Sequence, residues 1–367
     1  MTKVLITILL LLFAVLCYPL LASDDKYGAE FLHQLIPAEG EGMGESHIAY
    51  SIGSRSLNNN PAGLSFGKDN ELFIGFHRTP EVIATIMKEN ENEEWEDFGK
   101  YDIKPTEVEY INYSLPKSKI GILGLSFAFS HSGRFIRVNK EGKAINAFPQ
   151  DDALIGIGYS VKFPKDMAFG FDLKALRSKV PTDNGNRIGR TYAMNVGLMQ
   201  QVNDRVRIGA SLQNIGNNLS FKNVDKKADI PDKLRRDLLL GALYKVIDGK
   251  KSKLSVSMDI NPPFNDGLRY SVGTELLYTK YLALRAGYMR DTQPYYDPFV
   301  NLSDGSSVND EREWVRRGIA LDIGVRLKNI EINLARTPSR EPVLNDGEKL
   351  RMDKQESVTS ISFVVRF

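Results

Sequence analysis

Histidine, cysteine and serine carry much of enzyme and metal chemistry, and this chain offers few of them in a useful pattern. It has one cysteine, Cys17, and its four histidines have no metal-ligand spacing: His33, His47, His77 and His131. We expect no nucleophile elbow, no phosphate loop and no dinucleotide-binding loop. The sequence therefore predicts no enzyme, no metal site and no cofactor. A hydrolase would need a serine and a histidine that only the fold brings together.

Charged residues of both signs recur instead on the polar side of alternating segments. Inside a barrel, such charges would pair across the lumen or bond to a plug; the alternative is a polar throat or a head-group site. Gly156 and Gly158 lie on a similar polar face, where small residues let a neighbour or a plug approach. The candidate lumen charges are Arg207, Arg269, Glu275, Arg285, Asp322 and Arg326.

Strands must position these charges. From Glu71 onward, apolar residues alternate with small or polar ones, which predicts strands with one apolar face. About fourteen such segments occur, and most have the roughly 9–13 residues that a tilted strand needs to cross a bilayer. They lie near 70–78, 106–115, 119–131, 153–163, 167–178, 190–201, 205–215, 235–247, 252–260, 268–278, 281–291, 315–327, 329–336 and 356–367.

The connections between these segments alternate short and long. Outer-membrane barrels have short periplasmic turns and long outer loops, and their strands average to a low hydropathy such as the value of -0.27 found here. We therefore predict an all-β transmembrane antiparallel barrel of about 14 strands, with an N-terminal hatch, or plug, in its lumen. The long connections are polar, and we expect solvated loops at 79–105, 132–152, 179–189, 216–234, 292–314 and 337–355.

The N-terminus indicates export. Lys3 is followed by an apolar run from Val4 to Leu16 and by the small residue Ala22, so residues 1–22 read as a cleavable signal peptide; an uncleaved anchor is the alternative. Residues 23–66 would form a periplasmic segment and the lumenal hatch, and residues 67–367 the barrel. The net charge of +2 does not indicate a protein that binds nucleic acid. The predicted location is the outer membrane of a Gram-negative cell.

The stretch from Gly40 to Leu64 is the predicted hatch. Its glycines allow close backbone approach. The proline disfavours helix at the preceding Asn60, and the residues that follow favour a tight turn into the first strand. The predicted hatch motif comprises Gly42, Gly44, Asn60, Pro61, Ala62 and Gly63.

Apolar residues at inward or loop positions could form a ligand pocket. The candidates are Leu239, Leu243, Leu277 and Met289, although each could equally serve loop packing. Ahead of the hatch, Phe31, Leu32 and Leu35 could form one apolar helical face. An acyl chain gains about 0.8 kcal/mol per buried CH₂, so a plugged barrel with an apolar pocket suits a hydrophobic cargo better than a water-filled pore does.

Several stretches of the mature chain carry a family resemblance: "GEGMGESHIAYSIGSRSLNNNPAGL", "IGASLQNIGNNLSF", "YLALRAGYMR" and the terminal "SFVVRF". With these, the chain resembles the FadL superfamily of outer-membrane proteins, in particular its PorV/PorQ-like branch. The Asn60-Pro61-Ala62 motif is the most specific match. The resemblance implies a fourteen-stranded barrel whose hatch or N-terminal tail is displaced by ligand, with a lateral opening in the wall.

The resemblance also implies the function and the partners. We expect uptake of hydrophobic molecules such as long-chain fatty acids, gated by the hatch. The alternative is a PorV-like component of type IX protein secretion or cell-surface attachment, with secretion-system proteins as partners. Outer-membrane lipids surround such a barrel, and the terminal Phe367 resembles the aromatic end that the outer-membrane assembly machinery recognises.

Overall fold

The structure is a computed structural model of the chain. It describes residues 27–67, 70–90, 92–138, 144–182, 185–221, 230–262, 268–296, 311–342, 348–354 and 357–367. The predicted signal peptide, with Cys17, lies outside the described residues.

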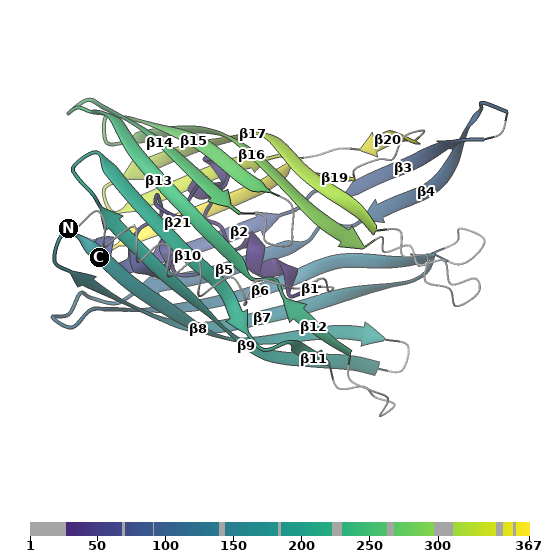
Figure 1. Cartoon of the computed structure of the whole chain (residues 1–367), viewed down its shortest axis with the longest axis horizontal. Helices are drawn as coiled ribbons and strands as arrows, with labels where there is room; N and C mark the ends of the chain where they lie inside the picture. The colour runs from purple at the N-terminus through teal and green to yellow at the C-terminus, as the bar shows by residue number, and fades with distance from the viewer. Residues whose placement is uncertain are drawn as a thin grey trace.

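Among the described residues, fourteen antiparallel strands form a closed barrel (Figure 1). Each strand pairs with the next one in the ring, and the last returns to the first, with Val365 opposite Leu72. In ring order they are β2 (Glu71–Arg78), β5 (Glu107–Ser114), β6 (Ile122–Val138), β7 (Ala144–Phe163), β8 (Met167–Thr182), β9 (Gly185–Gln201), β10 (Val206–Gly216), β13 (Asp237–Asp248), β14 (Ser252–Asn261), β15 (Arg269–Tyr278), β16 (Leu282–Tyr296), β17 (Glu311–Leu327), β18 (Ile330–Thr337) and β21 (Val358–Arg366).

Each predicted strand segment overlaps one of these strands, so the predicted fold class is confirmed. All six long connections contain strand residues where we expected plain loops; β6 and β7 extend into 132–152, and β8 and β9 extend into 179–189. β3 (Val82–Glu89), β4 (Trp95–Ile103) and β20 (Glu348–Lys354) pair as a separate three-stranded sheet, which projects beyond the barrel in Figure 1. Period-two patterning did not reveal them because Val82–Met87 lacks a polar face and charged residues interrupt the apolar face of β4.

Four short strands of the described chain add to the ends of the barrel strands or pair with one another. β11 (Leu219–Phe221) and β12 (Ile230–Leu234) follow β10, and β12 also pairs with β1 (Tyr27–Gly28). β19 (Arg340–Pro342) pairs with the outer part of β17. These elements lie toward the end of the barrel that carries the long connections. The short turns and the C-terminus lie at the other end (Figure 1).

The barrel wall is apolar outside and polar inside. In β18, Ile330, Ile332 and Leu334 are exposed on the outer face, whereas Glu331 and Asn333 are fully buried on the inner face. This reverses the arrangement of a soluble protein and suits strands that face lipid. No helix among the described residues is long and apolar enough to cross a membrane.

The N-terminal segment occupies the lumen (Figure 1). It contains η1 (Glu30–Gln34), α2 (Ala38–Gly42), η2 (Gly53–Ser56) and η3 (Pro61–Phe66). Residues 53–65 are all buried. The hatch therefore fills the barrel with short turns rather than with a folded domain, and its polar backbone must find partners on the wall.

Candidate functional site

Glycines on the inner wall let the hatch lie directly against it. They face one another in pairs on neighbouring strands: Gly124 and Gly158, Gly170 and Gly197, Gly209 and Gly241, and Gly273 and Gly287. A Cβ at Gly170 would stand 2.4 Å from the carbonyl carbon of Pro61, and one at Gly273 would stand 2.2 Å from the carbonyl oxygen of Met43. At Gly170 and Gly273, no side chain larger than hydrogen fits without moving the hatch backbone.

Asn60 ties the last hatch turn to the wall. Its side-chain oxygen accepts a hydrogen bond from the Ala62 N–H (3.3 Å), and Pro61 is the first residue of η3. Its amide nitrogen donates to the carbonyl oxygens of Ile48 (3.0 Å) and of Leu198 in β9 (3.1 Å). One buried amide thus joins two hatch segments and one strand, because Asn carries both donors and an acceptor.

The hatch glycines of the predicted motif also lie at close contacts. A Cβ on Gly42 would stand 2.0 Å from the Cβ of Asp322, and one on Gly63 would stand 2.6 Å from the Ser51 carbonyl oxygen. Gly44 has a φ of +69° and lies against the backbone of Tyr288 in β16. The positive φ together with the backbone contact requires glycine there.

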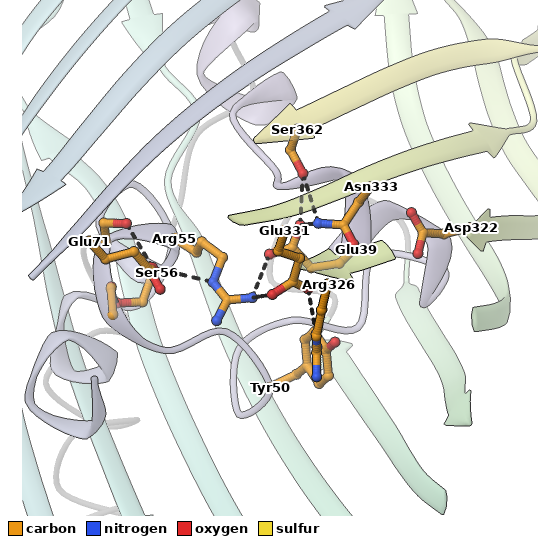
Figure 2. Close-up of polar contacts among 12 residues, drawn as sticks. Glu39, Tyr50, Arg55, Ser56, Glu71, Asp322, Arg326, Glu331, Asn333 and Ser362 are labelled. Atoms are coloured by element: carbon orange, nitrogen blue, oxygen red, sulfur yellow. Dashed lines mark hydrogen bonds and ion pairs between the residues drawn. The ribbon is translucent and has the colours of Figure 1, made fainter. Parts of the chain in front are cut away.

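A buried network of charges links the hatch to one side of the wall (Figure 2). Arg55 of the hatch lies 3.1 Å from Glu39, 3.4 Å from Glu71 of β2 and 4.0 Å from Glu331 of β18. Glu331 also pairs with Arg366 of β21 at 2.9 Å. Buried charges are stable only when paired, so this network fixes the hatch against β2, β18 and β21.

Four of the six predicted lumen charges join the same network. Arg285 bonds to Glu275 (2.8 Å) and to Asp322, and Arg326 lies 3.1 Å from Glu331. The Tyr50 hydroxyl of the hatch donates to Glu275 at 2.6 Å. These charges are paired with one another and with the hatch, and they do not line an open polar throat.

The other two predicted charges lie on β15 and β10 of the wall and contact other parts of the hatch. Arg269 bonds to Glu45 at 2.6 Å, and Arg316 contacts the same carboxylate. Burial alone would raise the pKa of Glu45, but the two guanidinium groups outweigh it and lower the pKa to about 2. Arg207 donates to Gln201 (2.9 Å) and lies over the Phe66 ring at the end of η3.

Asp259 of β14 holds the middle of the hatch by its backbone. Its Oδ2 accepts hydrogen bonds from the N–H groups of His47 (2.7 Å) and Ile48 (2.8 Å). Burial, followed by the nearby charge of Arg269, lowers the pKa of the His47 imidazole to about 4. His47 is therefore neutral in the attached hatch at physiological pH.

The fold does bring a serine, a histidine and an acid together, but not as a hydrolytic triad. Ser360 Oγ and Glu41 Oε1 lie 3.1 Å and 2.7 Å from the same nitrogen, Nδ1 of His77. A triad needs the serine and the acid on opposite ring nitrogens. Contrary to the expectation from the sequence, Gly63, Ser65 and Gly67 have the spacing of a nucleophile elbow. Ser65 lies in the 3-10 turn η3, however, and not between a strand and a helix, and its hydroxyl contacts that of Ser160.

An apolar cluster lies toward the end of the lumen with the long connections. Phe31, Leu32 and Leu35 of the N-terminal segment pack there, as their predicted common face suggested. The described wall residues of the cluster are Phe73, Val108, Tyr110, Ala128, Leu154, Leu176, Ala193, Leu219, Phe221, Leu234 and Val364. These residues form a continuous apolar surface inside the lumen.

The four predicted pocket residues are placed elsewhere. Leu239, Leu243 and Met289 are buried on the inner wall, and Leu277 is partly buried near a short turn. In the described part of the chain, none of them belongs to the cluster around Phe31. Single-strand periodicity identifies inward positions but not which of them the hatch already covers.

One cation borders the apolar cluster. The Arg187 guanidinium lies over the Phe221 ring at 5.7 Å. Its Nε and Nη2 atoms are buried and have no hydrogen-bond partner among the described residues. A guanidinium with two buried nitrogens that have no partner among the described residues, beside an apolar surface, is well placed to receive an anionic head group. The described residues include no group of three or more His, Cys, Asp or Glu that could hold a metal.

We expect Asn60→Leu to loosen the hatch. The change removes the hydrogen bonds from Asn60 to the carbonyl oxygens of Ile48 and Leu198 and costs about 2 kcal/mol. Hydrogen–deuterium exchange should show faster exchange of the amides at 48–64 in the folded barrel, with Asn203→Leu, in an exposed turn, as the control. Pro61→Leu should act in the same direction. Equal protection in Asn60→Leu and the wild type would count against this anchor.

We also expect acid to weaken the part of the hatch attachment that depends on His47. A released His47 would have an ordinary pKa of about 6.5, so the released state takes up a proton that the attached state excludes. The contribution of His47 to attachment is therefore complete above pH 6.5 and falls by about 1.4 kcal/mol per unit down to about pH 4. Between pH 7 and pH 5, hatch amide exchange, corrected for intrinsic rates, should rise more in the wild type than in His47→Asn. The same pH dependence in both proteins would contradict the assignment.

No protein-family model matches the sequence, and no curated protein matches it. Solved structures do share the fold. The toluene transporter TodX of P. putida superposes with a TM-score of 0.61 at 16% identity, over 90% of this chain and 98% of TodX. The toluene transporter TbuX of Ralstonia pickettii superposes with a TM-score of 0.58 at 12% identity, over 90% of this chain and 98% of TbuX. A FadL homologue of Pseudomonas aeruginosa superposes with a TM-score of 0.55 at 12% identity, over 90% of this chain and 98% of the homologue. The chain therefore has the fold of these transport barrels over nearly its whole described length.

Proposed function

We propose that this protein is an outer-membrane channel for hydrophobic small molecules such as long-chain fatty acids, with the N-terminal hatch as its gate. The observation that carries the proposal is the apolar cluster around Phe31 inside a polar barrel. The transport barrels of similar fold support it, as two of them are named toluene transporters.

The cluster is a suitable place for an apolar cargo because the protein's own side chains occupy it. Phe31, Leu32 and Leu35 enter on a short 3-10 turn, which few backbone hydrogen bonds hold in place. A cargo that replaces these side chains keeps the wall residues dry and gains about 0.8 kcal/mol per buried CH₂. Exchange between the N-terminal segment and the cargo would then couple binding to movement of the hatch.

Arg187 favours an acidic cargo over a neutral one. The carboxylate of a fatty acid would give its guanidinium a charge-assisted partner, while the acyl chain follows the apolar cluster from Phe221. A neutral hydrocarbon would leave the guanidinium unpaired. This places the head-group site on β9 rather than at the charges predicted from the sequence.

The remaining assignments belong to the same proposal. The signal peptide delivers the chain, and Phe367, 69% exposed beside the short turns, serves the assembly machinery. The hatch motif and the lumen charges hold the gate, and Leu239, Leu243, Leu277 and Met289 line the path of the cargo. The PorV-like role in secretion is the alternative, and the projecting sheet of β3, β4 and β20 is the surface that would serve it.

Uptake into vesicles tests the proposal. Vesicles that contain the purified barrel should take up labelled oleate faster than empty vesicles, while a small sugar should enter no faster. Leu154→Asn, which places an amide in the apolar cluster, should reduce oleate uptake. If oleate uptake equals that of empty vesicles and secreted proteins instead co-purify with the barrel, the secretion role replaces this one.

The head-group assignment has its own test. Arg187→Gln should weaken the binding of oleate about tenfold, as expected for the loss of one charged hydrogen bond, and should leave methyl oleate unaffected. Arg190→Gln, an exposed charge on the same strand, is the matched control. Equal effects on the acid and on its ester would refute a head-group role for Arg187.

A further inference from the structure

The short turns of the barrel carry a concentrated positive charge. The six turns span 115–121, 164–166, 202–205, 249–251, 279–281 and 328–329, and each has at least one exposed basic residue. The eight basic residues are Lys117, Lys119, Lys165, Arg205, Lys250, Lys251, Lys280 and Lys328, against the two acids Asp166 and Asp204, a net charge of 8 − 2 = +6. The whole chain has only +2, so the charge is gathered at this end.

The acids near this rim do not cancel the excess. Asp166 is paired with Lys162 at 2.7 Å, on the adjoining end of β7. Asp248, at the end of β13, is paired with Lys253 at 3.0 Å. Both partner lysines lie outside the turns, so these two ion pairs use no basic residue of the turns.

Exposed aromatic residues lie directly beside the basic turns. Tyr278 is 56% exposed, Tyr281 is 50% exposed, and Phe163 and Tyr244 are also exposed on the outer face. Lys280 lies over the Tyr281 ring at 5.4 Å. Aromatic girdles mark the interface between a bilayer and water. The basic side chains therefore begin where lipid phosphates would lie, and lysine stems are long enough to reach them.

We propose that this basic rim binds the phosphate groups of anionic phospholipids in the membrane leaflet at the short-turn end. The charges follow the whole circumference, since the turns join six different strand pairs. An annulus of lipids would contact charges around the whole circumference. A docked protein would contact charges gathered on one side of the barrel. The inference rests on the bilayer location in the proposed function but not on transport.

Native mass spectrometry of the full barrel tests this inference. In micelles with equal phosphatidylglycerol and phosphatidylcholine, the wild type should retain the anionic lipid in about fivefold excess or more. The variant Lys250→Gln, Lys251→Gln, Lys280→Gln and Lys328→Gln should lose most of this excess. A control with four charges removed at the other end should keep it: Arg78→Gln, Lys88→Gln, Lys349→Gln and Arg351→Gln.

Three results would overturn the inference. They are equal retention of the two lipids by the wild type, an equal loss in both variants, or displacement of the lipid by soluble glycerophosphate or poly-glutamate at the same charge concentration. Oleate uptake by the rim variant separates the two proposals. Normal uptake with no lipid preference would refute the rim and leave the channel intact.

Discussion

Direct contact between the hatch backbone and the backbone of the wall is the constraint on which this structure depends. A barrel of fourteen strands has a wide lumen, and here short turns rather than a folded domain fill it. Such turns have no core of their own, so their polar groups must be satisfied by the wall. The paired wall glycines have no side chains, so the hatch backbone can lie against the wall. Asp259 of the wall and Asn60 of the hatch supply hydrogen bonds between the two.

The hatch is held differently on its two sides. Toward β6–β10 it lies on glycines and on the Asn60 amide, while toward β2, β16–β18 and β21 it meets the buried network around Glu331. Breaking that network would leave several charges unpaired in a dry lumen, at a high cost. The N-terminal turn with Phe31 is held by apolar packing and by a smaller set of polar contacts, such as His33 with Asp237 at 3.1 Å. If the hatch opens as proposed, we expect this turn to move before the charged side does.

The sequence was sufficient to predict the barrel but not the internal contacts. Strand positions were predictable because lipid and lumen impose opposite polarities on successive residues, as in Ile330 and Glu331. Arg55 and Glu39 look like solvated charges in the sequence, since nothing local shows that a hatch buries them. Of the wall glycines, only Gly158 stood out, because the others become a pattern only once the strand register is known. The strands of the projecting sheet depend on pairing between two distant loops.

Covalent locking of the hatch tests the central claim most directly. The hydroxyl oxygens of Ser46 in the hatch and Ser257 in β14 lie 2.7 Å apart in the buried lumen. In the variant Ser46→Cys with Ser257→Cys, an oxidised barrel should take up oleate into vesicles about tenfold more slowly, the equivalent of about 1.4 kcal/mol, and reduction should restore the rate. The two single-cysteine variants should be insensitive to oxidation. Unchanged uptake through a fully cross-linked barrel would contradict the claim that the hatch is the gate.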